Sequence, residues 1–282
     1  MNSELDQIVR EMSGIQGKYI SRFDESFLLK SLNKRMIATS TATISGYREY
    51  LSEHEGEPEE FIRSLNITYS EFFRNPLTFA VLEQHVLPRL IDEKRESGSA
   101  EIRVWSAGCA AGQESYSVAI LLDELLTAQK NPLSFRIFGT DISGECLATA
   151  SRGVYDEAAL QNIRLKHIHS CFESLNGMHS VAGRLKRRLE FSFYDLLDER
   201  STSPPGSIYG DFDLIFCCNL LFYYTPEIRQ VILNKVIHAL SGGGYLVTGE
   251  AERAIVEEST GLIELFTMSA IFQKTNERKV ML

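Results

Sequence analysis

The sequence lacks several features that mark specialised classes of protein. No apolar run approaches the roughly 20 residues that a membrane-spanning helix needs, so we expect no membrane insertion. Residues 1–14 are acidic and polar, whereas a secretory signal would be basic and then apolar. With 44% hydrophobic and 24% charged residues among 282, the chain has instead the composition of an ordinary globular protein.

The cysteines are too few and too irregularly spaced for a disulfide framework or a zinc site. There are five of them, an odd number, and no two stand in a C-x-x-C spacing. They are Cys109, Cys146, Cys171, Cys217 and Cys218. We therefore expect reduced thiols, a cytoplasmic location and no metal.

Positive charge is also scarce, with 29 lysines and arginines against 38 aspartates and glutamates and a net charge of −9. This balance argues against a dedicated nucleic-acid-binding protein, so any positive surface has to be local. Two segments, 18–35 and 183–188, are locally basic. Their basic residues are Lys18, Arg22, Lys30, Lys34 and Arg35, and Arg184, Lys186, Arg187 and Arg188. Solvated surface is one interpretation of both segments; the alternatives are an acidic partner for the first and nucleic acid for the second, and we predict no nucleic-acid partner.

The hydrophobic spacing changes its period near residue 96. Residues 1–90 carry helical patterns, the loop 96–101 follows, and strands then alternate with helices. Such alternation predicts the α/β class with a doubly wound, mostly parallel sheet. We therefore predict a helical N-terminal domain at 1–95 and an α/β domain at 96–282. Residues 153–188 separate two strands by more than a crossover helix needs, which indicates an insertion.

The stretch WSAGCAAGQESY at 105–116 is the most informative, because a strand runs through a Gly-x-x-x-Gly turn into a helix. It lacks the lysine and hydroxyl residue of a phosphate-binding loop, and Ala110 occupies the middle position of a G-x-G-x-x-G motif. Glu114 follows the turn, and Asp141 ends the next strand. Ligands of open α/β sheets bind beyond the carboxyl ends of the strands, so both carboxylates should face one crevice.

Two carboxylates in one crevice select the kind of ligand. They would repel a pyrophosphate, but they suit S-adenosyl-L-methionine, which carries an amino group, a cationic sulfonium and a ribose diol and no phosphate. Asp141 stands where the second strand of a mononucleotide fold presents an acid to ribose hydroxyls. Two plainer interpretations stay open: the glycines could serve a close contact between helix and strand, and Glu114 could be a solvated glutamate favoured by the helix dipole.

Five segments, in this order and at this spacing, resemble the chemotaxis-receptor glutamate methyltransferase (CheR) family. They are SEFFRNP (70–76), VWSAGCAAGQESYSVAILL (104–122), FGTDISGECLATASRGVY (138–155), FDLIFCCNLLFYY (212–224) and LSGGGYLVTGEAE (240–252). The resemblance covers nearly the whole chain. It implies a class I, Rossmann-like adenosylmethionine-dependent methyltransferase domain with a helical N-terminal domain and a small antiparallel sheet inserted at about 153–188.

The resemblance also implies roles for particular residues. Arg74 and Tyr223 would be catalytic, with Arg74 beside the reacting carboxylate and Tyr223 facing the methyl group. Glu114 would hold the amino group of the cofactor, Asp141 its ribose, and Asp195 with Leu196 its adenine. The implied cofactor-binding residues are Thr68, Ser70, Arg74, Gly108, Glu114, Asp141, Asp195, Leu196, Cys218 and Asn219. The chain departs from the family at Cys218, where an arginine is usual, at GEAE (249–252), where G-H-S-E is usual, and at Thr68 and Ser70, where an N-x-T is frequent.

The activity that the resemblance implies is methyl transfer from S-adenosyl-L-methionine, with S-adenosyl-L-homocysteine as product, to glutamate side chains of chemoreceptors, which sets receptor adaptation. The partner would be the acidic methylation helices of the cytoplasmic receptor domain, with Lys30, Lys34 and Arg35 as candidate contacts. Capture of a receptor tail by the insert is an open question. Other acceptors on the same fold, and a sensor that binds the cofactor without turnover, remain as alternatives, as do a surface ion pair for Arg74 and a packed core position for Tyr223.

Overall fold

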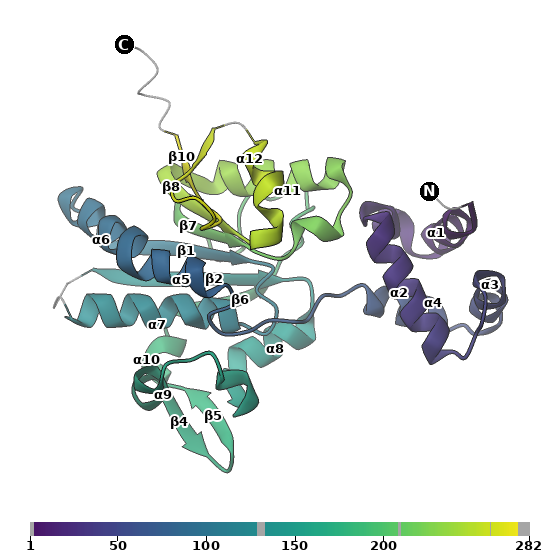
Figure 1. The fold of residues 1–282 in the computed structure, drawn as a ribbon, viewed down its shortest axis with the longest axis horizontal. Coiled ribbons are helices and arrows are strands. Elements are labelled where there is room, and N and C mark those ends of the chain that lie inside the picture. Colours follow the sequence, from purple (N-terminus) through teal and green to yellow (C-terminus); the bar gives the residue numbers. More distant parts are fainter. Residues whose placement is uncertain (1–2, 129–132, 208–209, 260, 276–282) are drawn as a thin grey trace. The chain divides into compact units, whose positions relative to one another are not determined.

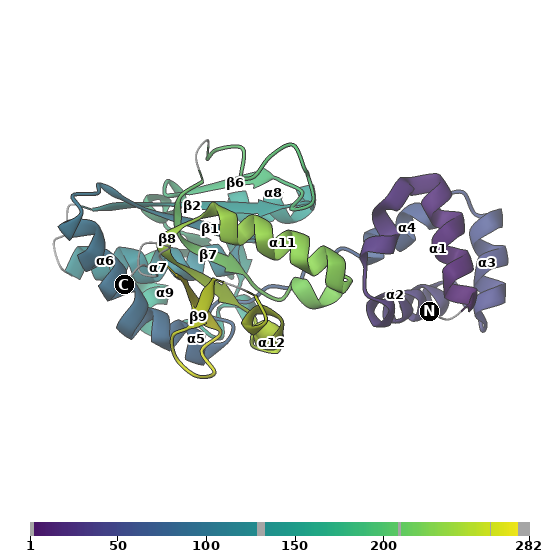
Figure 2. The same cartoon turned by 90° about the horizontal axis from the view of Figure 1, so that it is seen from above.

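The computed structural model describes residues 3–128, 133–207, 210–259 and 261–275. The chain divides into two compact units, one formed by Met1–Ile67 with Leu221–Gln230 and the other by Thr68–Leu220 with Val231–Leu282. Figures 1 and 2 show the helices of the first unit and the sheet of the second in two views. The predicted domain boundary at residue 95 is a statement about which parts of the chain fold independently. It stays a prediction.

The first unit is helical. Its elements are α1 (Ser3–Gln16), the short helix η1 (Gly17–Arg22), α2 (Glu25–Ala38), α3 (Ile44–Glu53), α4 (Glu57–Ser64) and the short helix η4 (Leu221–Tyr223). The apolar spacing of α2 puts Leu28 and Leu32 in the core, where both are almost fully buried. Asp24 caps this helix by accepting the backbone N–H of Ser26 at 3.0 Å.

The second unit is built on a seven-stranded sheet in the order β6-β2-β1-β7-β8-β10-β9. Its strands are β1 (Glu101–Ala107), β2 (Ser134–Asp141), β6 (Leu189–Phe193), β7 (Phe212–Cys217), β8 (Leu240–Thr248), β9 (Leu262–Glu264) and β10 (Ile271–Lys274). The first five pair in parallel, and β10 is antiparallel to both of its neighbours. The strand order reverses between β1 and β7, where a ligand of such a sheet binds. The predicted class I, Rossmann-like fold is confirmed.

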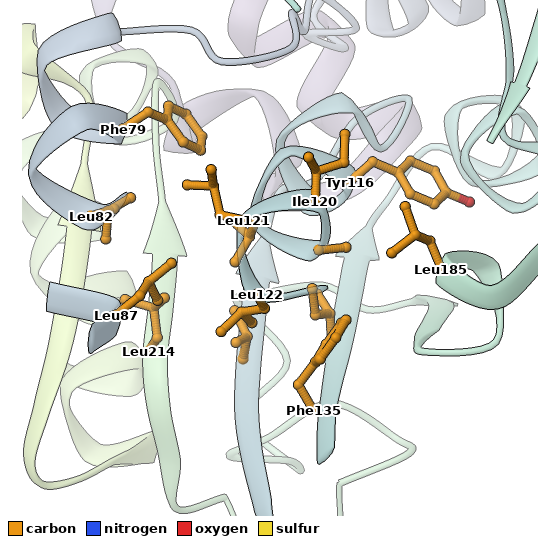
Figure 3. Close-up of a cluster of buried hydrophobic side chains, with 14 of the residues drawn as sticks. Phe79, Leu82, Leu87, Tyr116, Ile120, Leu121, Leu122, Phe135, Leu185 and Leu214 are labelled. Atoms are coloured by element: carbon orange, nitrogen blue, oxygen red, sulfur yellow. The ribbon is translucent and has the colours of Figure 1, made fainter. Parts of the chain in front are cut away.

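Helices between the strands supply the crossovers and cover the sheet. They are α7 (Gln113–Ala128), α8 (Gly144–Arg152) and α11 (Pro226–Ala239), with η5 (Glu250–Glu252) and α12 (Arg253–Glu257) after β8. A preceding segment made of α5 (Pro76–Val81), the π-helical turn η2 (Leu82–Val86) and α6 (Leu87–Glu96) packs in the same core. Figure 3 shows Phe79, Leu82 and Leu87 of this segment in one cluster with side chains of α7 and β7. The apolar face of 76–96 is therefore part of the core that supports the sheet.

The predicted insertion is a small subdomain with its own antiparallel sheet of three strands in the order β3-β5-β4. Its elements are β3 (Val154–Asp156), the short helix η3 (Ala158–Leu160), α9 (Leu165–Cys171), β4 (Phe172–Leu175), β5 (Met178–Val181) and α10 (Gly183–Lys186). Side chains of its basic segment are engaged in this unit: Arg184 pairs with Asp123 at 3.0 Å, and Lys186 donates to the hydroxyl of Ser180 at 3.0 Å. Figure 1 shows β4 and β5 projecting beyond α7 and α8.

Candidate active site

The glycine turn that joins β1 to α7 has a backbone conformation that only some residues tolerate. Gly108, Ala110 and Gly112 have φ angles of +74°, +45° and +89°, in the left-handed region that favours glycine. A Cβ on Gly112 would lie 2.8 Å from the Cβ of Ala150 on α8, so no side chain fits there. Gly112 is therefore required by a close packing contact, as one of the plainer interpretations of the motif predicts. At Gly108 a Cβ would meet Leu220 at an ordinary 3.5 Å, so the positive φ is what requires glycine there.

Asp141 lies where its motif predicts, at the carboxyl end of β2 and beside the turn. Its carboxylate accepts the N–H of Ala110 at 2.9 Å and the N–H of Ser143 at 2.8 Å. Burial raises the pKa of Asp141, and the two backbone hydrogen bonds oppose that effect. Because each carboxylate oxygen has two lone pairs, the group can tie down the turn and still accept a hydroxyl of a ligand.

Glu114 stands in the first turn of α7, and its carboxylate is held by neutral groups. The hydroxyl of Ser106 donates to its Oε1 at 2.7 Å. Burial raises the pKa of Glu114 to about 7, with the hydrogen bonds from Ser106 and Cys218 and the charge of Arg74 acting in the opposite direction. The structure thus brings Arg74 and Cys218 into the electrostatic surroundings of Glu114. A carboxylate in this setting gains a great deal from a cationic ligand, because that ligand replaces the lost solvation.

A second buried carboxylate shapes the end of β7, and the sequence interpretation missed it. Glu252 is completely buried, and its Oε2 accepts the backbone N–H of Asn219 at 2.7 Å and of Gly249 at 3.0 Å. Asn219 is thereby held at a φ of +56°. The motif GEAE pointed to this stretch only as a departure from a family pattern. Its spacing, an acid three residues after Gly249, matches one half of a capping box, in which the carboxylate at N3 accepts the backbone N–H of the N-cap residue.

Cys218 precedes Asn219, and its thiol is neutral. Burial raises the pKa of Cys218 well above its usual value, and the nearby carboxylates of Glu114 and Glu252 raise it further. Its Sγ lies 3.6 Å from the carbonyl oxygen of Val247. Where the family usually has a cation, this chain therefore has a small uncharged donor.

The residues predicted to flank the adenine follow the edge strand β6. Phe193 of β6 pairs with Asp141 of β2, so Asp195 and Leu196 come directly after the strand end that lies next to Asp141. Leu196 is buried, and Asp195 accepts the N–H of Leu197 at 2.8 Å. Predicted cofactor residues thus follow the carboxyl ends of β1, β2, β6 and β7, which all lie at the same end of the sheet.

The segment before α5 carries Thr68, Ser70 and Arg74. Thr68 is exposed, whereas Ser70 and Arg74 are half-buried. The guanidinium carbon of Arg74 lies 5.2 Å from the centre of the Tyr69 ring, a distance at which a cation is attracted to the ring face. The positive charge of Arg74 also lowers the pKa of Glu114, by less than the hydrogen bonds from Ser106 and Cys218 do.

Tyr223 belongs to the other unit. Its ring packs edge-on against Phe27 at 4.7 Å, and its carbonyl accepts the N–H of Asp24 at 2.8 Å. The structure does not bring it together with Arg74 within one unit. Its position facing the methyl group stays a prediction.

The three basic residues named as partner contacts differ in their surroundings. Lys30 and Lys34 are exposed on α2. Arg35 donates to both carboxylate oxygens of Glu57 at 2.9 and 2.6 Å, and the hydroxyl of Tyr47 donates to the same carboxylate at 2.6 Å. Arg35 therefore holds α2 to α4, and of the three residues the two lysines are the ones that present charge to solvent.

Two features of the described residues bear on other classes of function. In those ranges no cluster of three or more His, Cys, Asp or Glu side chains is arranged to hold a metal ion. Among the helices of the described ranges, none has the length and apolar character to span a membrane.

The residues present fit an adenosylmethionine. The half-buried carboxylate of Glu114 suits an amino group, the carboxylate of Asp141 suits a diol, and the positive-φ turn allows close approach of the backbone. The side-chain oxygen of Gln113, the residue before Glu114, is buried and makes no hydrogen bond in the structure. All of these groups are acceptors or neutral, which matches a ligand without phosphate.

Comparisons with known proteins agree with this chemistry. The family model "CheR methyltransferase, SAM binding domain" matches residues 68–270. The chain is 30% identical over 235 residues to "Chemotaxis protein methyltransferase 1" of Pseudomonas aeruginosa, covering 81% of this chain and 82% of that protein. It is 35% identical over 202 residues to the chemotaxis protein methyltransferase of Vibrio parahaemolyticus, covering 70% and 67%. Among solved structures it is similar to the N-methyltransferase NodS of Bradyrhizobium japonicum in complex with S-adenosyl-L-homocysteine, at 15% identity and a TM-score of 0.34, covering 68% of this chain and 87% of that chain.

Proposed function

The chain belongs to the CheR methyltransferase family and is an S-adenosylmethionine-dependent methyltransferase, and from this premise we propose that it methylates glutamate side chains of chemoreceptors. The product would be S-adenosyl-L-homocysteine with a glutamyl methyl ester, and the reaction would set receptor adaptation in the cytoplasm. No metal takes part in the proposed reaction.

The observation that carries the proposal is that Glu114 and Asp141 both lie on the side of the sheet where the parallel strands end. Glu114 would hold the amino group of the cofactor together with the side-chain oxygen of Gln113, and Asp141 would hold the ribose. Asp195 and Leu196 would flank the adenine, and Cys218 and Asn219 would line the pocket at the end of β7. Gly108 would let the backbone approach, and Thr68 and Ser70 would add polar contacts beside Arg74.

The acceptor needs little chemical activation. The pKa of a free glutamate is about 4.3, so the attacking carboxylate is already ionised near neutral pH and requires no general base. When bound, the cofactor supplies a methyl group on a positively charged sulfur. Charge disappears as the methyl group moves to the carboxylate oxygen, so a site that excludes water favours the transition state over the reactants.

The main task of the protein is then to position the acceptor. Holding the oxygen, the methyl carbon and the sulfur in line is an effect worth up to about 7–11 kcal/mol. Arg74 would orient the carboxylate, and Tyr223 would contact the methyl group or the substrate. A tight ion pair with Arg74 would stabilise the reactants and slow the step. The guanidinium, shared between the Tyr69 ring and the surroundings of Glu114, suits an orienting role.

The charges of α2 support an acidic helical substrate. Lys30 and Lys34 are exposed on one helix of a chain with a net charge of −9. Complementary charge steers association more than it adds affinity, so we assign the two lysines to substrate capture. Arg35 is left out of this surface because Glu57 holds it.

Incubation with tritiated S-adenosylmethionine and chemoreceptor cytoplasmic domains tests the proposal. Label that alkali releases as methanol supports a glutamyl methyl ester. Alkali-stable label would mean another kind of acceptor. Absence of label, with cofactor binding shown by calorimetry, would contradict the proposal in favour of a cofactor sensor, an outcome that Cys218 in place of the family's arginine makes worth testing.

A further inference from the structure

The segment Phe72–Phe73–Arg74 is clamped by the inserted subdomain. The ring of Phe72 is completely buried and packs edge-on against two insert residues, Tyr155 at 4.9 Å and Phe172 at 5.7 Å. Its neighbour Arg74 is the residue proposed to orient the substrate carboxylate. The insert therefore contacts the chain two residues before Arg74.

Phe73 is held by a second set of contacts. The imidazole of His167 on α9 lies parallel to the Phe73 ring at 6.0 Å and 18°, and the ring of Phe79 packs edge-on at 5.2 Å. The backbone N–H of Phe73 donates to the hydroxyl of Ser117 at 2.9 Å, and that hydroxyl donates to the carbonyl of Gln113 at 2.7 Å. Ring and backbone of Phe73 are thus fixed from different directions.

These contacts matter because the backbone on both sides of Arg74 is strained. Phe73 has a φ of +51° and Asn75 a φ of +63°. Residues other than glycine adopt this region at a cost, and such conformations persist where the surroundings over-determine them. The direction in which Arg74 leaves the backbone depends on both angles.

His167 is itself immobilised. It is 3% exposed, and its Nε2 lies 2.7 Å from a carboxylate oxygen of Glu124 on α7. Glu124 also binds Lys166 at 2.5 Å. Arg164, which precedes α9, forks onto both oxygens of Glu83 at 2.6 and 2.7 Å. The α9 helix is therefore tied to α7 and to η2, and turning the imidazole away from Phe73 would break its bond to Glu124.

We propose that His167 is a positioning residue, which fixes the strained turn around Arg74 through the ring of Phe73 and so makes the inserted subdomain part of the machinery that aims Arg74. This inference rests on the proposed function of Arg74. It gives the insert a role in catalysis that is independent of any peptide its sheet might capture.

The first test compares His167→Ala with His167→Phe. The alanine variant removes the stacked ring, and we expect kcat to fall between about tenfold and about a hundredfold, the upper figure being the cost of a misplacement of about 1 Å. The affinity for S-adenosylmethionine, measured by calorimetry, should stay within a factor of two. The phenylalanine variant keeps a flat ring on Phe73 and should recover most of kcat. A loss of cofactor affinity as large as the loss of kcat, or no recovery with phenylalanine, would overturn the inference.

A double-mutant cycle with Arg74→Lys tests whether His167 acts through Arg74. If it does, His167→Ala should lower kcat by less than about twofold in the Arg74→Lys background, because residues that work through one contact are not additive. An equal fall in both backgrounds would show an effect by another route. Leu185→Ala is the control for stability, since it truncates a fully buried insert residue on α10. It should lower the melting temperature without the fall in kcat, and a matching fall there would overturn the inference.

Hydrogen exchange separates this inference from the proposed function. The amide of Phe73 donates to the hydroxyl of Ser117, so its exchange should speed up in His167→Ala and be restored in His167→Phe, whatever the substrate is. If the wild-type chain fails to methylate receptors while this amide behaves as expected, the proposed function fails and the positioning role stands. Unchanged exchange with active wild-type protein would overturn the positioning role alone.

Discussion

Two carboxylates at opposite ends of the sheet have opposite surroundings. Asp213, at the start of β7, pairs with the ammonium of Lys94 at 2.7 Å and accepts the N–H of Arg103 at 2.9 Å. Glu114, just past the end of β1, accepts a hydrogen bond from the hydroxyl of Ser106, and the neutral thiol of Cys218 also lowers its pKa. Burial raises the pKa of both carboxylates. Asp213 has a lysine to compensate its charge, whereas the direct partners of Glu114 are neutral.

This difference in partners distinguishes an acid that stabilises the fold from an acid that is available to bind a ligand. A buried charge is expensive unless it is paired or fully hydrogen-bonded, so an acid with neither arrangement marks a place where a ligand can supply the missing charge. Glu252 shows a third arrangement, in which backbone N–H groups saturate a buried carboxylate and fix the chain around Asn219. Of the three acids, Glu114 is the one whose surroundings favour the binding of a cationic ligand.

Breaking the structural pair should give the largest effect. In Asp213→Ala the Lys94 ammonium loses its partner, and we expect the free energy of unfolding to fall by about 3 kcal/mol, the lower end for a broken buried pair because Lys94 keeps part of its hydration. Urea unfolding measures the change. Arg200→Ala, which removes a pair with an exposed arginine, should leave the free energy of unfolding nearly unchanged, because exposed ion pairs contribute little. Cofactor affinity should be unchanged in both variants. A large loss of affinity in Asp213→Ala would contradict a purely structural role for Asp213.

Removing the charge of Glu114 should have the opposite pattern, a loss of cofactor affinity without a loss of stability. Glu114→Gln keeps the shape of the side chain, and we expect the dissociation constant for S-adenosylmethionine to rise between about tenfold and about a hundredfold, since hydrogen bonds to charged groups contribute about 1.5–3 kcal/mol. Stability should not fall, because a carboxylate disfavoured by burial has been neutralised. Calorimetry and thermal unfolding together test the pair of expectations. Wild-type affinity in Glu114→Gln would mean that the amino group binds elsewhere.

The contrast between these acids also marks how far sequence reasoning reaches. The strand FDLIFC at 212–217 is predicted by its apolar run and is buried throughout, and the place of Glu114 and Asp141 follows from the rule that ligands bind at carboxyl ends of strands. Those inferences depend on neighbours in sequence or on strand order. The pairs Asp213 with Lys94 and Arg35 with Glu57 depend on tertiary packing, which no local pattern encodes.

The insert escaped a detailed prediction for a different reason. Its three strands contain three or four residues each, and most of their side chains are not buried. The alternation that identifies a half-buried strand needs a longer run. Likewise, His167 carries no motif, because its partners Phe73 and Glu124 come from segments distant in the chain.

The pH dependence of cofactor binding should sharpen the comparison further. The pKa of Glu114 is about 7, and an ammonium bound beside it lowers that pKa. Binding below pH 7 must therefore release a proton, so affinity should fall by up to about tenfold for each unit of pH below 7. It should also fall above about pH 8, where the amino group of the ligand loses its proton. Calorimetry in buffers of different ionisation enthalpy detects the released proton. In Glu114→Gln the acidic limb should vanish, and its persistence would assign the proton to another group.

Charges that are neither buried nor paired with a buried acid should affect substrate capture alone, with the smallest effect. In Lys30→Glu/Lys34→Glu we expect the KM for receptor to rise by about threefold to tenfold at low salt and by less at high salt, because rim charges act on association. Cofactor affinity and stability should stay the same. Arg136→Glu/Arg200→Glu, which reverses two exposed charges on the larger unit and so makes the same change in net charge, is the control. Arg35→Ala should instead destabilise the helical unit, since it leaves the buried carboxylate of Glu57 without its cation. An unchanged KM in the double variant would remove α2 from the receptor-binding surface and leave Arg35 as the only one of the three with a demonstrated role.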